Sequence, residues 1–145
     1  QQYYKAPYYA KQIVKQPNNI QNLETIYDGK KLEIKNTNLG LNKIYQNYNY
    51  LNDNILWLNN FVENCKQNYT IEETEDFIII NTKIEEKGDI EKLYLDKKRY
   101  NPTKLEIYNN NNNNKIYIIY KEIKLNNIQE DNIFAFKTKD IKEEV

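Results

Sequence analysis

The sequence predicts an α+β fold in which a curved antiparallel sheet of about eight or more strands has at least one helix packed on its concave face. Short segments with alternating apolar residues recur along the 145-residue chain, and clusters of Pro, Asn, Asp and Gly separate them. One segment switches to helical spacing. Because a sheet must bury one face against another element, the helix is the expected cover.

The N-terminal third is predicted to form strands. Tyr3 and Tyr4 resemble the end of a strand that Pro7 breaks, residues 8–15 read as a second strand, and residues 42–48 as a further one.

The clearest hairpin pattern spans residues 23–36. Asp28-Gly29 is a favoured two-residue turn, because both positions tolerate positive φ. This turn places Thr25 opposite Leu32. It leaves Ile26 on the polar face, which we expect to meet water.

In residues 54–65 the spacing of apolar residues changes from alternation to helical spacing, so this segment is predicted to form the helix. Its apolar positions are Ile55, Leu58, Phe61, Val62 and Cys65. Strands are predicted again after this helix, at 77–84, 90–96, 103–108 and 115–125. We expect one domain over residues 1–136 and a charged tail that frays over residues 137–145.

The composition excludes several function classes. Lys plus Arg and Asp plus Glu are both 21, so no net positive charge is present to hold a nucleic acid. Histidine and serine are absent, which removes Ser-His-Asp triads, Cys-His pairs and histidine-based zinc sites. We therefore expect no catalytic residues, no cofactor and no metal. Cys65 falls on the apolar face of the predicted helix and is interpreted as a small buried hydrophobe.

Carboxylate pairs are the remaining enzymatic route. Glu72, Glu73, Glu75 and Asp76 precede a strand, and two carboxylates at the right separation hydrolyse glycosides. No aromatic or apolar residues frame this cluster as a sugar cleft requires. The favoured interpretation is a solvated acidic edge that protects the neighbouring strand from aggregation.

Tyrosine is the notable candidate for partner binding, with 14 residues in the chain. Tyrosine offers rigid contact area with a polar tip, which suits protein interfaces. A low-GC genome of the clostridial type explains the same surplus by codon usage, as it explains the 25 Asn and 20 Ile residues. Both interpretations stay open. The candidate interface residues are Tyr3, Tyr4, Tyr8, Tyr9, Tyr45, Tyr48 and Tyr50.

Residues 94–108 resemble a recurring segment of the LolA/LolB-like lipoprotein-carrier superfamily. Residues 94–98 read Tyr-Leu-Asp-Lys-Lys, Pro102 follows, and residues 104–108 read Lys-Leu-Glu-Ile-Tyr. In that superfamily a strand ending in Leu-Asp-Lys is followed by Pro and a returning strand with Lys-x-Glu. Residues 3–7 and 26–30 also resemble the corresponding segments. With its Asn-rich composition, the chain is most similar to the clostridial germination lipoproteins.

The resemblance implies a half-barrel of antiparallel sheet wrapped around helices. It implies a spore lipoprotein, held on the extracytoplasmic side of a membrane by a lipid on an N-terminal cysteine. It further implies a non-enzymatic role in germination, as partner and activator of a CwlD-like N-acetylmuramoyl-L-alanine amidase that modifies cortex peptidoglycan. The chain contains no methionine, so we expect an N-terminal segment with a Leu-x-Gly-Cys lipobox to precede it.

Two further expectations complete the prediction. In an alternative function, the half-barrel carries a lipid or lipoprotein acyl chain. The predicted cavity lining is then Trp57, Phe61, Ile78 and Ile80. Because an open sheet has unpaired edges, we also expect a homodimer formed by strand exchange.

Overall fold

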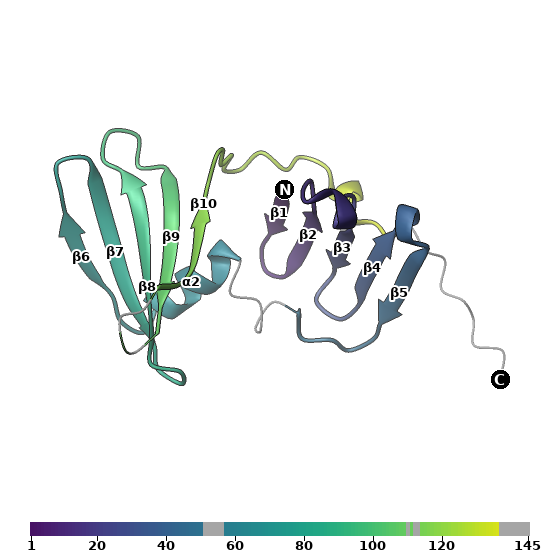
Figure 1. Cartoon of the computed structure of the whole chain (residues 1–145), viewed down its shortest axis with the longest axis horizontal. Helices are drawn as coiled ribbons and strands as arrows, with labels where there is room; N and C mark the ends of the chain where they lie inside the picture. Colours follow the sequence, from purple (N-terminus) through teal and green to yellow (C-terminus); the bar gives the residue numbers. More distant parts are fainter. Residues whose placement is uncertain (51–56, 110, 112–113, 137–145) are drawn as a thin grey trace. The chain divides into compact units, whose positions relative to one another are not determined.

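The computed structural model describes residues 1–50, 57–109, 111 and 114–136, without the side chains of residues 114–115 (Figure 1). The chain divides into two compact units. One comprises Gln1–Asp53 and Asn126–Val145, and the other Asn54–Leu125. The predicted tail over residues 137–145 lies outside the described residues, and the single domain over residues 1–136 stays a prediction.

The first unit contains a five-stranded antiparallel sheet whose strands pair in chain order. Its strands are β1 (Gln2–Lys5), β2 (Tyr9–Ile13), β3 (Glu24–Tyr27), β4 (Leu32–Asn36) and β5 (Leu41–Tyr45). Three short 3₁₀ helices accompany them: η1 (Asn18–Ile20), η2 (Thr37–Leu39) and η3 (Asp131–Phe134).

The second unit contains another five-stranded antiparallel sheet, in the order β10-β9-β8-β7-β6, and the helix α2 (Leu58–Cys65). Its strands are β6 (Thr70–Glu73), β7 (Phe77–Ile84), β8 (Asp89–Asp96), β9 (Pro102–Tyr108) and β10 (Asn114–Ile119). The helix agrees with the end of the predicted 54–65 segment, whose first residues lie outside the part of the chain that the structure describes.

The predicted single curved sheet of about eight or more strands is wrong. Among the described residues the strands form two sheets, with β5 at an edge of one beside β4 and β6 at an edge of the other beside β7. After Tyr45 the chain leaves the first sheet, and α2 is formed before the next strand begins. The helix packs on the second sheet. The alternation of apolar residues predicts strands but carries no information on which of them share a ladder.

The hairpin register also differs from the prediction. Tyr27 lies opposite Leu32 and Thr25 opposite Ile34, a shift of two residues that leaves a four-residue loop at 28–31. The Asp28 carboxylate explains this, because its Oδ1 accepts hydrogen bonds from the N–H groups of Lys30 and Lys31, at 2.9 and 2.8 Å. The side chain thus closes a wider loop than the favoured two-residue turn.

The core of the second unit is aliphatic. Phe61 of α2 packs on Leu93, Leu105 and Ile107, which come from adjacent strands and share one face of the sheet. Cys65 packs against the same core, as predicted. The alternation of β8 and β9 places these residues under the helix, so the burial of their side chains holds helix and sheet together.

The core of the first unit is mixed. Tyr27 and Leu32 are buried on one face of the sheet, and Ile26 and Glu33 are each 1% exposed on the other. The expectation that Ile26 meets water is therefore wrong. On the face of Ile26, the ring of Phe134 lies against Tyr9 with centroids 5.7 Å apart, and Lys5 forms an ion pair with Asp131. The C-terminal segment η3 therefore covers a sheet face that the local sequence predicts to be polar.

Candidate functional site

The tyrosines predicted to bind a partner all lie in the first unit, but the structure separates them into two groups. Tyr3, Tyr4, Tyr9 and Tyr50 are partly buried. Three others are more exposed: Tyr8, Tyr45 and Tyr48 are 43%, 41% and 46% exposed.

The partly buried tyrosines have structural contacts. The Tyr50 ring lies 5.7 Å from Tyr27, and its hydroxyl is 3.3 Å from the Thr25 hydroxyl. Tyr9 contacts Phe134, as described above, and the Tyr4 hydroxyl donates to the Pro7 carbonyl at 2.9 Å. Packing therefore accounts for Tyr9 and Tyr50, and the hydroxyl of Tyr4 holds the β1–β2 turn.

The exposed tyrosines gather at one end of the first sheet. Tyr8 lies in the β1–β2 turn, Tyr45 ends β5, and Tyr48 follows it. Antiparallel pairing places the β1–β2 turn, the 28–31 loop and the end of β5 side by side (Figure 1). We call this surface, formed by Tyr8, Tyr45, Tyr48 and the 28–31 loop, the tyrosine end.

The 28–31 loop supports the tyrosine end. The N–H of Tyr48 donates to the Lys30 carbonyl at 3.0 Å. The Tyr8 ring lies against Gly29 so closely that a Cβ at Gly29 would be 2.5 Å from a ring carbon. With φ of +100°, Gly29 also has a backbone conformation that glycine adopts most readily. The loop therefore ties Tyr8 and Tyr48 to the same hairpin.

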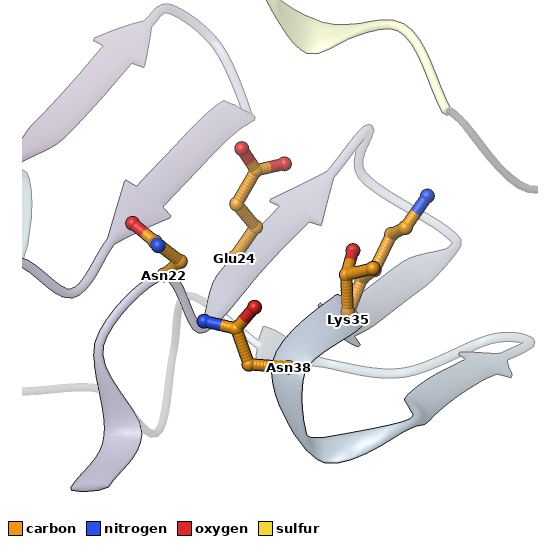
Figure 2. Close-up of a pocket in the computed structure, with 5 residues that line it drawn as sticks. Asn22, Glu24, Lys35 and Asn38 are labelled. Carbon is orange, nitrogen blue, oxygen red and sulfur yellow. The ribbon is translucent and has the colours of Figure 1, made fainter. Parts of the chain in front are cut away.

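A polar hollow of about 190 Å³ lies at the opposite end of this sheet. Figure 2 shows the side chains of Asn22, Glu24, Lys35 and Asn38 around it. Glu24 and Lys35 are cross-strand neighbours of opposite charge. The hollow is open and mostly polar, whereas small-molecule sites are enclosed and mostly apolar. It is therefore a weaker candidate than the tyrosine end.

The residues predicted to line a lipid cavity lie on the helix-covered side of the second unit. Trp57 and Phe61 are each 2% exposed, and Ile80 packs against the Phe61 core. Ile78 lies two residues before Ile80 on the same strand, hence on the same sheet face. The Phe61 side chain contacts the sheet residues of the core and so fills the space between α2 and the sheet.

The helix-covered face also holds a carboxylate that sequence patterns did not single out. Glu91 shares a face with Leu93 and is 1% exposed, and its Oε2 accepts a 2.8 Å hydrogen bond from Asn64 of α2. Burial raises the pKa of Glu91, although the Asn64 hydrogen bond opposes this rise. The signal available in the sequence was a glutamate at an apolar position of the alternating 91–95 stretch.

Glu91 also affects two neighbouring groups. Burial, followed by the charge of Glu91, raises the pKa of the Cys65 thiol and raises that of Tyr120 to about 12. A thiol with a raised pKa is a poor nucleophile, because the thiolate is the reactive form. The arrangement therefore favours a structural role for Cys65.

The opposite face of the second sheet carries a charged and aromatic cluster. Glu106 accepts hydrogen bonds from Tyr94 at 2.9 Å and from Tyr108, and pairs with Lys104 at 2.6 Å. Burial raises the pKa of Glu106, but these three donors outweigh it and lower the pKa overall. Burial, followed by the hydrogen bond to Glu106, raises the pKa of Tyr94 to about 12, and the hydrogen bond to Glu106 raises the pKa of Tyr108 to about 12. All four side chains have partners, so the cluster reads as a structural network.

The predicted acidic edge is confirmed by the structure. Glu72 and Glu73 are exposed on the edge strand β6, and Glu75 and Asp76 are exposed in the turn that follows. Among the described residues, no group of three or more His, Cys, Asp or Glu side chains is placed to hold a metal ion. No helix in the described part of the chain is both long enough and apolar enough to cross a membrane.

Comparisons with known proteins give one informative likeness. No protein-family model matches the sequence, and no curated protein matches it. Among solved structures, the chain is similar to one in the structure of the CwlD amidase from Clostridioides difficile in complex with the GerS lipoprotein. The TM-score is 0.66 at 22% identity, over 85% of this chain and 72% of that chain. This likeness establishes a shared fold.

Proposed function

We propose that this protein is a non-enzymatic spore lipoprotein that binds and activates a CwlD-like N-acetylmuramoyl-L-alanine amidase during germination. The observation that carries the proposal is the shared fold with the amidase-binding GerS lipoprotein, at a TM-score of 0.66 over 85% of the chain. Residues 94–108 carry the sequence resemblance. They form the end of β8 and β9, which pair as antiparallel neighbours in the second unit.

The chemistry of the described residues is consistent with binding. The acidic residues nearest to a glycosidase-like pair are solvated at an edge strand, and the thiol of Cys65 is held protonated by burial. The exposed tyrosines at one end of the first sheet supply contact surface of the kind found in protein interfaces. Activation of the enzyme then arises from docking, since the activator contributes no reacting group.

Two finer parts of the proposal concern placement and assembly. We propose an N-terminal lipid anchor that holds the protein at a spore membrane, on its extracytoplasmic side. We also propose a homodimer by strand exchange, in which an edge strand of the first unit's sheet, β1 or β5, is exchanged. A monomer mass in light scattering would refute the dimer.

Co-expression with the CwlD-like amidase of the same organism tests the central proposal. The expected result is a complex that co-purifies through size exclusion, and an amidase that releases more peptide from cortex peptidoglycan in the complex than alone. The matched control is the amidase with an unrelated small β protein. An amidase that is fully active alone, and that does not co-purify, would overturn the proposal.

The lipid-carrier alternative makes a different prediction. An acyl chain under α2 requires Phe61 to separate from Leu93 and Leu105, which it contacts. A carrier is expected to retain lipid through purification from membranes, and mass spectrometry of the extracted protein would detect it. The packing of Phe61 favours the binding protein.

A further inference from the structure

We infer that the tyrosine end is the surface on which the amidase docks. The inference rests on the proposed function and names the residues that carry it. Of the seven tyrosines predicted as interface, it selects Tyr8, Tyr45 and Tyr48, because the other four have a packing role or lie on the sheet faces.

The geometry of the tyrosine end suits a protein partner. The three tyrosines expose between 41% and 46% of their surface, so their rings are held by the fold while their outer parts remain open. Tyr45 and Tyr48 contact each other with centroids 6.0 Å apart, and Tyr8 contacts Tyr9 at 5.2 Å. Rings that are already ordered lose little side-chain entropy on binding, which favours tight contacts.

The chemistry around these rings identifies the class of partner. The exposed side chains between Tyr45 and Tyr48 and after it are amides, Gln46, Asn47 and Asn49, and the nearby lysines Lys5, Lys30 and Lys43 come from separate elements. The Asp28 carboxylate is engaged by the loop's own N–H groups. A surface on which tyrosine rings and amides accompany dispersed lysines, one of them paired with Asp131, matches a protein interface, where aromatic residues are enriched.

The ring orientations also argue against a saccharide. Oligosaccharides stack on aromatic faces that lie open and nearly coplanar, whereas the Tyr45 and Tyr48 planes are inclined by 47° and contact each other. The amidase itself, and not its glycan substrate, is therefore the occupant that this surface fits.

A pair of matched triple variants tests the inference. The first is Tyr8→Ala, Tyr45→Ala and Tyr48→Ala at the tyrosine end. The second removes three tyrosines of the other unit, Tyr69, Tyr100 and Tyr117, which are 59%, 66% and 63% exposed. Both lose the same side chains, and the control loses the more exposed ones. Binding to the purified CwlD-like amidase is measured by calorimetry on the full chain.

The expected result is a loss of more than about tenfold in affinity for the first variant and less than about threefold for the second. If both variants bind like the wild type, the docking surface is wrong while the proposed function stands. If the wild type does not bind the amidase, the proposed function fails and the inference fails with it. A variant that binds normally but loses a wild-type dimer mass would assign the tyrosine end to a second copy, which also overturns the inference.

A single substitution distinguishes a loss of binding from a loss of folding. Tyr48→Arg changes a residue whose ring is 46% exposed and whose backbone N–H, not its side chain, bonds the 28–31 loop. It is expected to weaken amidase binding with an unchanged circular dichroism spectrum. Unchanged binding by this folded variant, together with unchanged binding by the triple variant, would reject the surface.

Discussion

The two five-stranded sheets have the same sequential antiparallel pairing but are stabilised by different side chains. The β6–β10 sheet buries aliphatic residues, among them Leu105 and Ile107, beneath α2. The β1–β5 sheet buries Tyr27, Glu33 and Asn36 together with Ile26. Identical topology is thus compatible with a core closed by an amphipathic helix, which also buries Glu91, and with a core in which tyrosine and polar side chains accompany Ile26.

The difference also separates packing from binding. The amphipathic helix α2 covers one face of the β6–β10 sheet with its apolar side. The β1–β5 sheet uses individual rings from short segments, such as Phe134 of η3 and Tyr50 after β5. In this sheet some tyrosine rings pack on the sheet faces, and the exposed rings of the tyrosine end provide contact surface. We place the partner at the tyrosine end. Trp57, the one tryptophan, lies in the second unit, so its fluorescence follows that unit separately.

The largest effect is expected from the aliphatic core. Leu105→Ala removes a side chain that is 0% exposed, and should lower the free energy of unfolding of the second unit by about 3 kcal/mol. Urea titration followed by Trp57 fluorescence measures it. Leu125→Ala is the control, because Leu125 is 72% exposed and should cost less than about 0.5 kcal/mol. Equal losses would mean that the helix-covered core does not stabilise the unit.

The next effect concerns the 28–31 loop. Gly29→Ala places a Cβ against the Tyr8 ring at a φ of +100°, and should cost the first unit about 1–3 kcal/mol. Tyrosine fluorescence during denaturation should shift while the Trp57 transition stays unchanged. Gly40→Ala provides the comparison, since Gly40 has a φ of +61° but nothing within 4 Å of its Cβ position. A Gly40 variant that loses as much stability would rule out the Tyr8 contact as the cause.

A smaller effect is expected at the polar core of the first unit. Asn36 is 1% exposed, its Oδ1 accepts from the N–H groups of Asn38 and Leu39, and its Nδ2 donates to the Gln21 carbonyl at 3.0 Å. Asn36→Ala should therefore cost about 1 kcal/mol, the typical value for losing an N-cap. Asn36→Ser is expected to retain the cap, because serine is a preferred N-cap residue, and to lose the bond to Gln21. Equal losses in the two variants, measured by urea titration, would contradict a capping role.

The smallest effect at neutral pH is expected from Glu91, and it depends on pH. Because burial raises the folded-state pKa of Glu91 above its usual 4.5, the folded protein binds this proton more tightly than the unfolded chain. The stabilisation is complete below pH 4.5 and is lost as the pH rises through the folded-state pKa. Glu91→Gln should remove this decline, so the variant gains stability relative to wild type as the pH rises. The difference between the two urea midpoints across acidic and neutral pH measures it, and a constant difference would contradict the prediction.

Much of the local structure was predictable. Residues 77–84 alternate and carry four consecutive apolar residues, and β7 has these same bounds. The helical spacing that ends at Cys65 predicted the end of α2. Composition alone predicts the tyrosine candidates, and it places packing rings and exposed rings in one set; their role in binding stays a prediction.

The misses share a physical cause. The turn at Asp28-Gly29 was assigned from backbone preferences, whereas the Asp28 side chain selected a loop of another length. Ile26 was assigned to the solvent because its neighbours on that face are charged, whereas the distant Phe134 segment returns to that face. Glu91 was overlooked because its partner, Asn64, is 27 residues away.

The sequence by itself determined most of the strands, the end of the helix and the apolar face on which Leu93, Leu105 and Ile107 meet, because side-chain periodicity is a local property of the chain. It did not indicate β6, and it extended the last strand to residue 125, whereas β10 ends at Ile119. Only the tertiary structure decided that the strands form two sheets and that three exposed tyrosines come together at one end. Strand pairing and the position of surface residues depend on contacts between residues far apart in the chain. The local pattern of side chains does not determine the free energy of those contacts.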